Sequence, residues 1–156
     1  MEGYNITDTH RQKAQNLYDF KALSNSIMRG GCNIIGALGE VMIQDIFEAY
    51  KPDTESTYDY DLIIQNDKID VKTGKVTRPP DKSYNAKIPA YQKFQETDYY
   101  FFGYVTADLT EYYLAGYIAK EQFFNLAELK RAGETEQDFT FRCDTYILKA
   151  GRLKEF

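Results

Sequence analysis

The stretch YDYDLIIQNDKIDVKTGKV, residues 58–76, decides the fold that the sequence predicts. Both halves alternate between apolar and polar side chains, which is typical of strands with one buried face. Between the halves stands Asn66-Asp67, a dipeptide suited to a two-residue turn with positive φ. We therefore predict a β-hairpin with one strand over residues 58–65 and the other over residues 68–76.

This turn would also fix the register of the hairpin. With Asn66 and Asp67 at the tip, the expected cross-strand pairs are Gln65 with Lys68, Ile63 with Asp70, and Asp61 with Lys72. Side chains alternate along a strand, so Asp61, Asp70 and Lys72 would share one face. The opposite face would be apolar, formed by Tyr60, Leu62, Ile64, Ile69 and Val71.

Two interpretations of the polar face are open. Asp61 and Asp70 would lie diagonally opposite, about 7–8 Å apart, and could share a hard divalent cation with the Val71 carbonyl as a further ligand. Lys72 beside such a cation could orient or deprotonate a water molecule. The alternative is a cross-strand ion pair on a solvated face, and the hairpin alone favours it. Asp59 shares the face of Asp61 and is the alternative for the first acid.

Two helices are expected before the hairpin. The first covers residues 8–28, with Thr7 or Asp8 as its cap and Gly30-Gly31 at its end. The second covers residues 33–50 and is apolar on nearly every face, which indicates a buried helix. Glu40 lies within it, and a buried carboxylate is costly unless it is paired or binds a metal. The competing explanation is a glutamate at the helix edge that pairs with a lysine or with water.

The rest of the chain predicts more strands than helices. We expect a loop over residues 78–81, a short helix over 88–96, strands over 98–105 and 112–118, a helix over 121–130, and strands over 139–143 and 145–149. The aromatic residues on the strands over 98–105 and 112–118 are expected to pack in the sheet rather than to stack on bases. Together the elements predict one domain, residues 1–156, of the α/β or α+β class around a mixed sheet.

Composition and charge limit the function. The chain has 156 residues, of which 43% are hydrophobic and 28% charged. It shows no membrane span and no signal peptide, and its two cysteines match no metal spacing, so we expect reduced thiols in a cytoplasmic, intracellular protein. The net charge of −5 argues against a polyanionic partner. However, the stretch from Lys68 to Lys93 has seven basic residues against two acidic ones, so it is either a solvated loop or a surface for nucleic acid.

Glu40, Asp61 and the segment Ile69-Asp70-Val71-Lys72-Thr73 together resemble the PD-(D/E)XK phosphodiesterase superfamily, the restriction-endonuclease-like fold. The family pattern is a glutamate on the helix before the sheet, an acid on the next strand, and acid-x-Lys on the strand paired with it. The resemblance covers about residues 33 to 118 and implies an αβββαβ core. No proline precedes Asp61, which departs from a common feature of the family.

This resemblance implies a metal-dependent DNA endonuclease. Asp61 and Asp70 would bind Mg²⁺ or Mn²⁺, Glu40 would complete or support the metal shell, and Lys72 would position the attacking water. The expected contacts with DNA are Thr73, Lys75, Arg78, Lys82 and Gln92. A homodimer is a further expectation, although no residue identifies an interface. The alternative function is a catalytically inactive nucleic-acid-binding or assembly protein on the same fold, and a plain protein–protein module is a third hypothesis.

Overall fold

The structure is a computed structural model that describes residues 1–23, 33–49, 59–136 and 138–156. Within these ranges the chain forms three α-helices: α1 (Asp8–Leu23), α2 (Ile34–Ile46) and α3 (Lys120–Leu126). The strands are β1 (Glu2–Asn5), β2 (Leu62–Ile64), β3 (Asp67–Val76), β4 (Asn85–Pro89), β5 (Tyr99–Thr106), β6 (Glu111–Ala119), β7 (Glu128–Lys130), β8 (Thr135–Glu136), β9 (Phe139–Thr140) and β10 (Thr145–Lys149). The same ranges contain the 3₁₀ turns η2 (Ala90–Gln92) and η3 (Ala150–Arg152).

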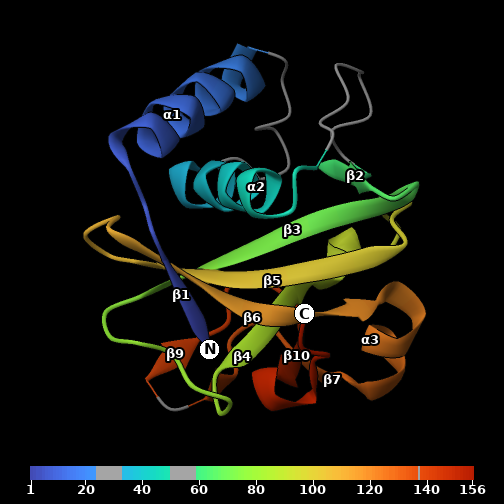
Figure 1. Ribbon diagram of the computed structural model, residues 1–156. Coiled ribbons are helices and arrows are strands. Elements are labelled where there is room, and N and C mark those ends of the chain that lie inside the picture. The colour runs from blue at the N-terminus through green and yellow to red at the C-terminus, as the bar shows by residue number, and fades with distance from the viewer. Residues whose placement is uncertain (24–32, 50–58, 137) are drawn as a thin grey trace.

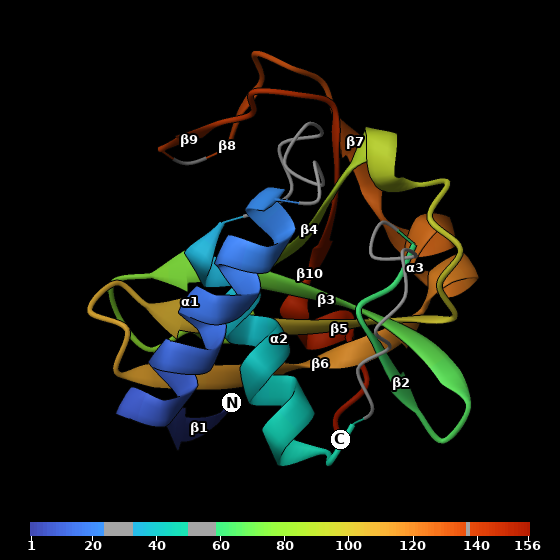
Figure 2. The same ribbon diagram turned by 90° about the horizontal axis from the view of Figure 1, so that it is seen from above.

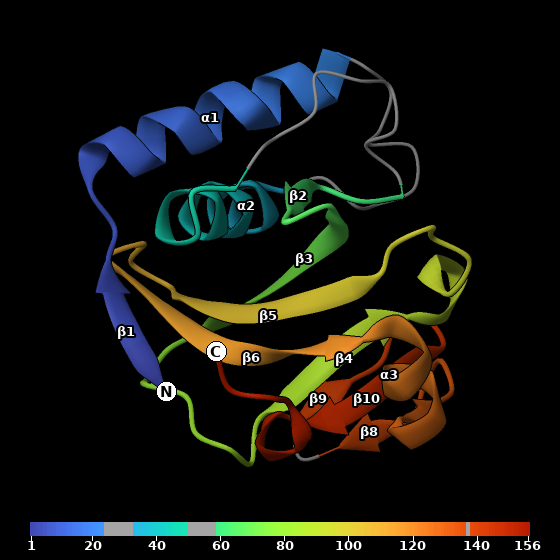
Figure 3. The same ribbon diagram turned by 45° about the vertical axis from the view of Figure 1, so that its right-hand side comes forward.

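A curled five-stranded sheet lies at the centre of the molecule, with the order β1-β6-β5-β3-β2 (Figure 1). The sheet is mixed, because β3 and β5 are parallel while the other neighbours are antiparallel. Helices α1 and α2 lie over one face, and the small sheet β4-β10-β7 lies with α3 below the other (Figure 3). The predicted α+β class with a mixed sheet is therefore confirmed.

Helix α2 lies between α1 and the sheet, as seen from above in Figure 2. Its residues 37–43 are all buried, which confirms the prediction of a buried helix. The helix begins after Asn33, whose side-chain Oδ1 accepts a hydrogen bond from the Gly36 N–H at 2.7 Å. Gly39 lies so close to β3 that a Cβ there would be 1.7 Å from Oγ1 of Thr73. This close approach places α2, and Glu40 with it, directly on the hairpin strand.

The two faces of the sheet belong to separate cores. On the α2 side, Leu62, Ile69 and Val71 of the hairpin join the helix residues. On the other side, Tyr100 and Phe102 of β5 pack with Phe123 of α3. Both cores are rich in aromatic rings, which confirms that the aromatic residues of β5 and β6 mainly build the sheet.

The register of the β2–β3 hairpin differs from the prediction. Its turn is Gln65-Asn66, with φ of 49° and 72°, and the observed pairs are Leu62 with Ile69, Ile63 with Lys68, and Ile64 with Asp67. The predicted pairs were therefore wrong by two positions. A shift by two preserves which side chains share a face, so the apolar pattern satisfies both registers equally well. Asn66 does take one of the two positive-φ positions, but as the second turn residue rather than the first.

Other element predictions also differ from the structure, among them the strand expected over 139–143, of which only Phe139–Thr140 (β9) is a strand. Residues 88–96 do not form a helix, because Ala86 and Ile88 are buried in a strand that pairs with β10, and only the 3₁₀ turn η2 follows. The helix expected over 121–130 ends at Leu126, and 128–130 is strand β7. Strand β1 was not predicted; it pairs with β6 at the edge of the sheet.

Other predictions concern segments outside the described residues. They are the last turn of the first helix with Gly30-Gly31, the end of the second helix at Tyr50, and the start of the first hairpin strand at Tyr58. Cys32 lies outside as well, while Cys143 is a half-buried free thiol. None of the described helices is both long and apolar enough to span a membrane.

Candidate functional site

Asp70 is a buried acid in the middle of β3, only 3% exposed. Lys72 lies two residues further along the strand and therefore on the same face. Its Nζ is 2.5 Å from Oδ2 of Asp70, and its side chain is 15% exposed. This Oδ2 is buried, and among the described residues it has no hydrogen-bond partner in addition to the ion pair. The pair is thus withdrawn from solvent, which contradicts the interpretation of Asp70 as a surface acid.

Asp61 lies immediately before β2 and beside β3. Its N–H donates to the Ile69 carbonyl at 2.8 Å, and its carboxylate Oδ2 accepts from the Val71 N–H at 2.8 Å. The Asp61 side chain is therefore fixed at the edge of β3 next to Asp70, rather than across from Lys72 as predicted. Val71 was expected to bind the cation through its carbonyl oxygen. The contact that the structure shows between Val71 and the acids is the hydrogen bond from its N–H to the Asp61 carboxylate.

Glu40 completes a group of three buried acids around this point, with 5% of its surface exposed. The pKa of Asp70 is raised to about 7, chiefly by burial. The charge of Lys72 and its hydrogen bond lower this pKa, and the charges of Asp61 and Glu40 raise it. The influence of Glu40 and Asp61 on this pKa shows that both carboxylates lie within electrostatic range of Asp70. The structure thus brings together all four of the predicted catalytic residues: Glu40, Asp61, Asp70 and Lys72.

Two glutamines hold the lysine and the central acid. Lys72 Nζ donates to Oε1 of Gln92 at 2.7 Å and to Oε1 of Gln95 at 3.3 Å. Gln95 Nε2 donates in turn to Oδ1 of Asp70 at 3.3 Å, and its own backbone carbonyl accepts from Lys120 Nζ. Gln92 was predicted at the site, but Gln95, which is 4% exposed, was missed. Its spacing of three residues from Gln92 places both side chains on one side of a 3₁₀ turn and also of the predicted α-helix, so this spacing did not by itself identify Gln95.

Asp59, the alternative first acid, has a different role. Its Oδ1 accepts a hydrogen bond from the Glu96 N–H at 3.1 Å, so it helps to hold the loop that follows Gln95. Asp61 and not Asp59 influences the pKa of Asp70. The geometry therefore favours Asp61 as the acid next to Asp70.

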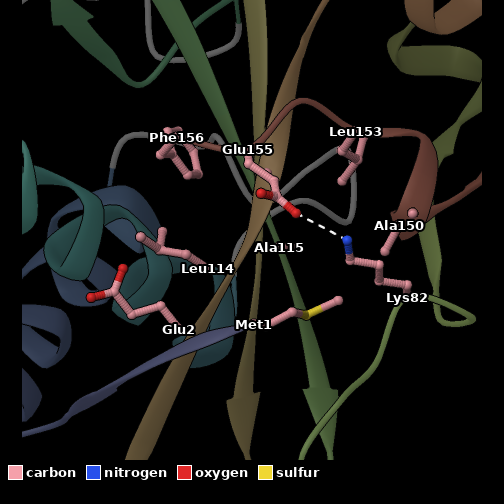
Figure 4. A pocket seen from close by; sticks show the side chains of 11 residues that line it. Met1, Glu2, Lys82, Leu114, Ala115, Ala150, Leu153, Glu155 and Phe156 are labelled. Atoms are coloured by element: carbon pink, nitrogen blue, oxygen red, sulfur yellow. Dashed lines mark hydrogen bonds and ion pairs between the residues drawn. The ribbon is translucent and has the colours of Figure 1, made fainter.

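The other predicted DNA contacts lie outside this cluster. The Thr73 hydroxyl is buried against α2 at Gly39, a position that does not favour the predicted contact with a phosphate. Lys75 is exposed further along β3, and Arg78 Nε donates to the Tyr84 hydroxyl at 3.2 Å. Lys82 pairs with Glu155 at 3.0 Å at the edge of a small pocket that contains none of the four predicted catalytic residues (Figure 4).

The donor set suits a hard divalent cation. Carboxylate oxygens are the ligands that Mg²⁺ prefers, and this ion is commonly held by one or two carboxylates together with water. Asp61 and Asp70 can supply such a pair. Within the described ranges, however, no group of three or more His, Cys, Asp or Glu side chains is close enough to form a ready metal cage. The residues therefore fit a cation held mainly by two acids, with Glu40 in a supporting position.

Chemically, the cluster has carboxylates that could bind a cation next to an ammonium group that could bind an anion. The acids would attract the cation, and Lys72 offers an ammonium held by two amide oxygens at the same point. Phosphodiester hydrolysis needs both, because negative charge develops on the phosphate oxygens in the transition state.

Comparison with the models of known protein families and with curated proteins finds no match to this chain. The interpretation of the site therefore depends on its residues and their geometry alone.

Proposed function

We propose that this protein is a metal-dependent nuclease that hydrolyses phosphodiester bonds in DNA. The observation that carries the proposal is the buried Asp70, which contacts Lys72 and lies within electrostatic range of Asp61 and Glu40. Grouping like charges in a buried place costs free energy. A bound divalent cation would offset that cost, which explains why a protein would keep such an arrangement.

The fold supports the resemblance to the PD-(D/E)XK nucleases in its central part. A buried helix with Glu40 precedes the β2–β3 hairpin, and the acid-x-Lys strand β3 lies inside the sheet. Two features depart from the expected αβββαβ core. Asp61 precedes its strand rather than lying in it, and the segment between β3 and β5 contains β4 and a 3₁₀ turn instead of a helix.

Each residue has a defined role in this proposal. Asp61 and Asp70 would hold Mg²⁺ or Mn²⁺, which supplies Lewis acidity and lowers the pKa of water. Glu40 would support that shell from α2. Lys72 would orient the attacking water and stabilise charge on the phosphate. Gln92 and Gln95 position the Lys72 ammonium, and Gln95 also positions the Asp70 carboxylate.

The test is cleavage of DNA by purified protein in Mg²⁺ or Mn²⁺, with supercoiled, linear and branched substrates. Asp70→Asn should abolish cleavage, whereas Asp67→Asn, at the exposed start of the same strand, should leave it intact. Lys72→Met should also lose activity while still binding Mn²⁺, as measured by calorimetry. If wild type and Asp70→Asn behave identically on every substrate, the proposal is wrong. DNA retention without cleavage by wild type would support the inactive DNA-binding alternative.

A further inference from the structure

The segment from Pro89 to Asp98 is held rigidly beside the candidate site. The Ala90 N–H donates to the Asp144 carbonyl at 2.8 Å, and the Asp98 N–H donates to the Lys68 carbonyl at 2.9 Å. Between these ends, Asp59 accepts from the Glu96 N–H, and Lys120 donates to the Gln95 carbonyl. Side chains on this segment are therefore presented in fixed directions.

The middle of the segment winds with a three-residue period. The Lys93 N–H donates to the Ala90 carbonyl at 3.2 Å, and the Gln95 N–H donates to the Gln92 carbonyl at 3.1 Å. In such a 3₁₀ winding, side chains three residues apart lie one above the other. Gln92 and Gln95 form one such row, and both contact Lys72.

Tyr91 and Phe94, also three residues apart, alternate with these glutamines along the segment. Tyr91 is 42% exposed, and Phe94 is 80% exposed, the highest value among the large hydrophobic side chains that the structure describes. Single exposed apolar residues are common on proteins. This pair is unusual because the same segment carries Gln92 and Gln95, which contact the candidate catalytic residue Lys72.

We propose that Tyr91 and Phe94 form a stacking platform for an unpaired base of the DNA strand that is cleaved. Aromatic side chains bind bases through their flat faces without regard to sequence. In an intact duplex both faces of each base are already covered by neighbours, so only an unpaired or displaced base offers a free face. The preferred substrate is therefore single-stranded DNA or a duplex with a flap, gap or bubble. This inference rests on the proposed nuclease function.

The platform and the site are joined through the same segment. Phe94 is next in the chain to Gln95, which contacts both Lys72 and Asp70. A base on Phe94 would therefore belong to a nucleotide close to the phosphate that reaches Lys72. Lys93 lies between the two aromatic residues and extends over the rings of Phe124 and Tyr146, with its Nζ 5.5 and 5.4 Å from their centres. It adds positive charge beside the platform without covering it.

The first experiment measures binding in EDTA to a fluorescent single-stranded oligonucleotide, its duplex, and a duplex with a flap. We expect wild type to bind the single-stranded and flap DNA more tightly than the duplex. Phe94→Ala should weaken binding to DNA with unpaired bases about 5- to 100-fold and leave duplex binding nearly unchanged. Phe94→Trp should preserve the preference. Phe20→Ala is the matched control, since Phe20 is 59% exposed but lies on α1.

A second readout separates stacking from a structural effect. A 2-aminopurine base placed in the unpaired region should lose fluorescence on binding wild type and Phe94→Trp, but not Phe94→Ala. The inference is overturned if Phe94→Ala binds all three DNA forms as wild type does, or weakens them equally. It is also overturned if this variant changes the oligomeric state in sedimentation, because the pair would then be a contact between subunits.

The failure of this inference can be told apart from the failure of the proposed function. Cleavage by wild type in Mg²⁺, with an unchanged preference in Phe94→Ala, would leave the nuclease proposal intact and remove the platform. Stacking without any cleavage would instead overturn the nuclease proposal and support a DNA-binding protein that uses the platform. If wild type binds no DNA in any form, both proposals are wrong.

Discussion

Gly39→Ala tests the close approach of α2 to β3 that places Glu40 near Asp70. A Cβ at this position would be 1.7 Å from Oγ1 of Thr73 and 2.8 Å from its Cβ. Rotation of the threonine could move the hydroxyl away, but the Cβ is fixed to the backbone. To restore an ordinary contact of about 3.4 Å, the helix and strand must separate by about 0.6 Å.

The expected change in stability follows from two opposing effects. Alanine in place of glycine favours the helix by about 0.5–1 kcal/mol. Overpacking a dense core costs about 1–3 kcal/mol. The net effect of Gly39→Ala should therefore be a loss of about 1–2 kcal/mol, which corresponds to a fall in Tm of roughly 2–8 °C for a chain of this length.

Gly36→Ala is the matched control on the same helix. In the part of the chain that the structure describes, a Cβ there would meet only Oδ1 of Asn33 at 3.5 Å, which is an ordinary contact. This variant should gain about 0.5–1 kcal/mol. Urea unfolding and thermal melts measure both variants, and Gly39→Ala combined with Thr73→Ala should recover part of the loss. If Gly39→Ala is as stable as Gly36→Ala, the tight packing of α2 against β3 is wrong.

Three further predictions address the site and its support. Because the pKa of Asp70 is raised to about 7, mainly by burial, the folded wild type without divalent cation should lose on the order of 1–4 kcal/mol of stability as pH rises from about 4 through 7, and Asp70→Asn should lack this loss. An equal fall in Tm for wild type and Asp70→Asn over this pH range would contradict the expectation. Mn²⁺ at 100 times its Kd should stabilise wild type by about 2.7 kcal/mol and leave the Tm of Asp70→Asn unchanged, as measured by differential scanning fluorimetry. Asn33→Ala should remove the cap of α2 and cost about 1 kcal/mol, whereas Asn33→Asp should retain it; equal urea midpoints for the two would show that the cap contributes nothing.

The elements that could be predicted from sequence are those with local signals. The apolar positions of α2 have helical spacing, and the alternation of β3, β5 and β6 has the period of a strand. The elements that could not be predicted depend on distant partners. Asn85–Pro89 becomes a strand because it pairs with β10, whose pairing residues are about sixty positions later in the chain. Nothing within residues 88–96 distinguishes that outcome from a short helix with a proline in its first turn.

The residues of the candidate site could be predicted better than their contacts. Glu40, Asp61, Asp70 and Lys72 are near one another as expected, because the helix–hairpin order alone brings them together. Gln95 could not be found, since it reaches Asp70 only through the irregular turn after β4. The burial of the Thr73 hydroxyl could not be predicted, because the position of Thr73 on its strand indicates that it faces α2 but not that Gly39 lets the helix cover the hydroxyl.

The change in register alters the physical meaning of the site. In the predicted register, Asp61 would pair with Lys72 across the hairpin, and each charge would be neutralised by its neighbour. In the structure Lys72 pairs with Asp70 on its own strand, and the Asp61 carboxylate accepts a hydrogen bond from the N–H of Val71, the residue next to that acid. The Lys72 ammonium therefore contacts the Asp70 carboxylate, while the charges of Asp61 and Glu40 raise the pKa of Asp70.

Exposed ion pairs contribute little to stability and form easily on a surface, but buried like charges are not kept without a compensating ligand or partner. A solvated ion pair, the interpretation that the hairpin alone favoured, thus explains the burial of Asp70 less well than a cation site does. Calorimetry with Mn²⁺ on wild type, Asp61→Asn and Asp70→Asn decides between the two, because a simple ion pair predicts no heat of binding in any of the three proteins.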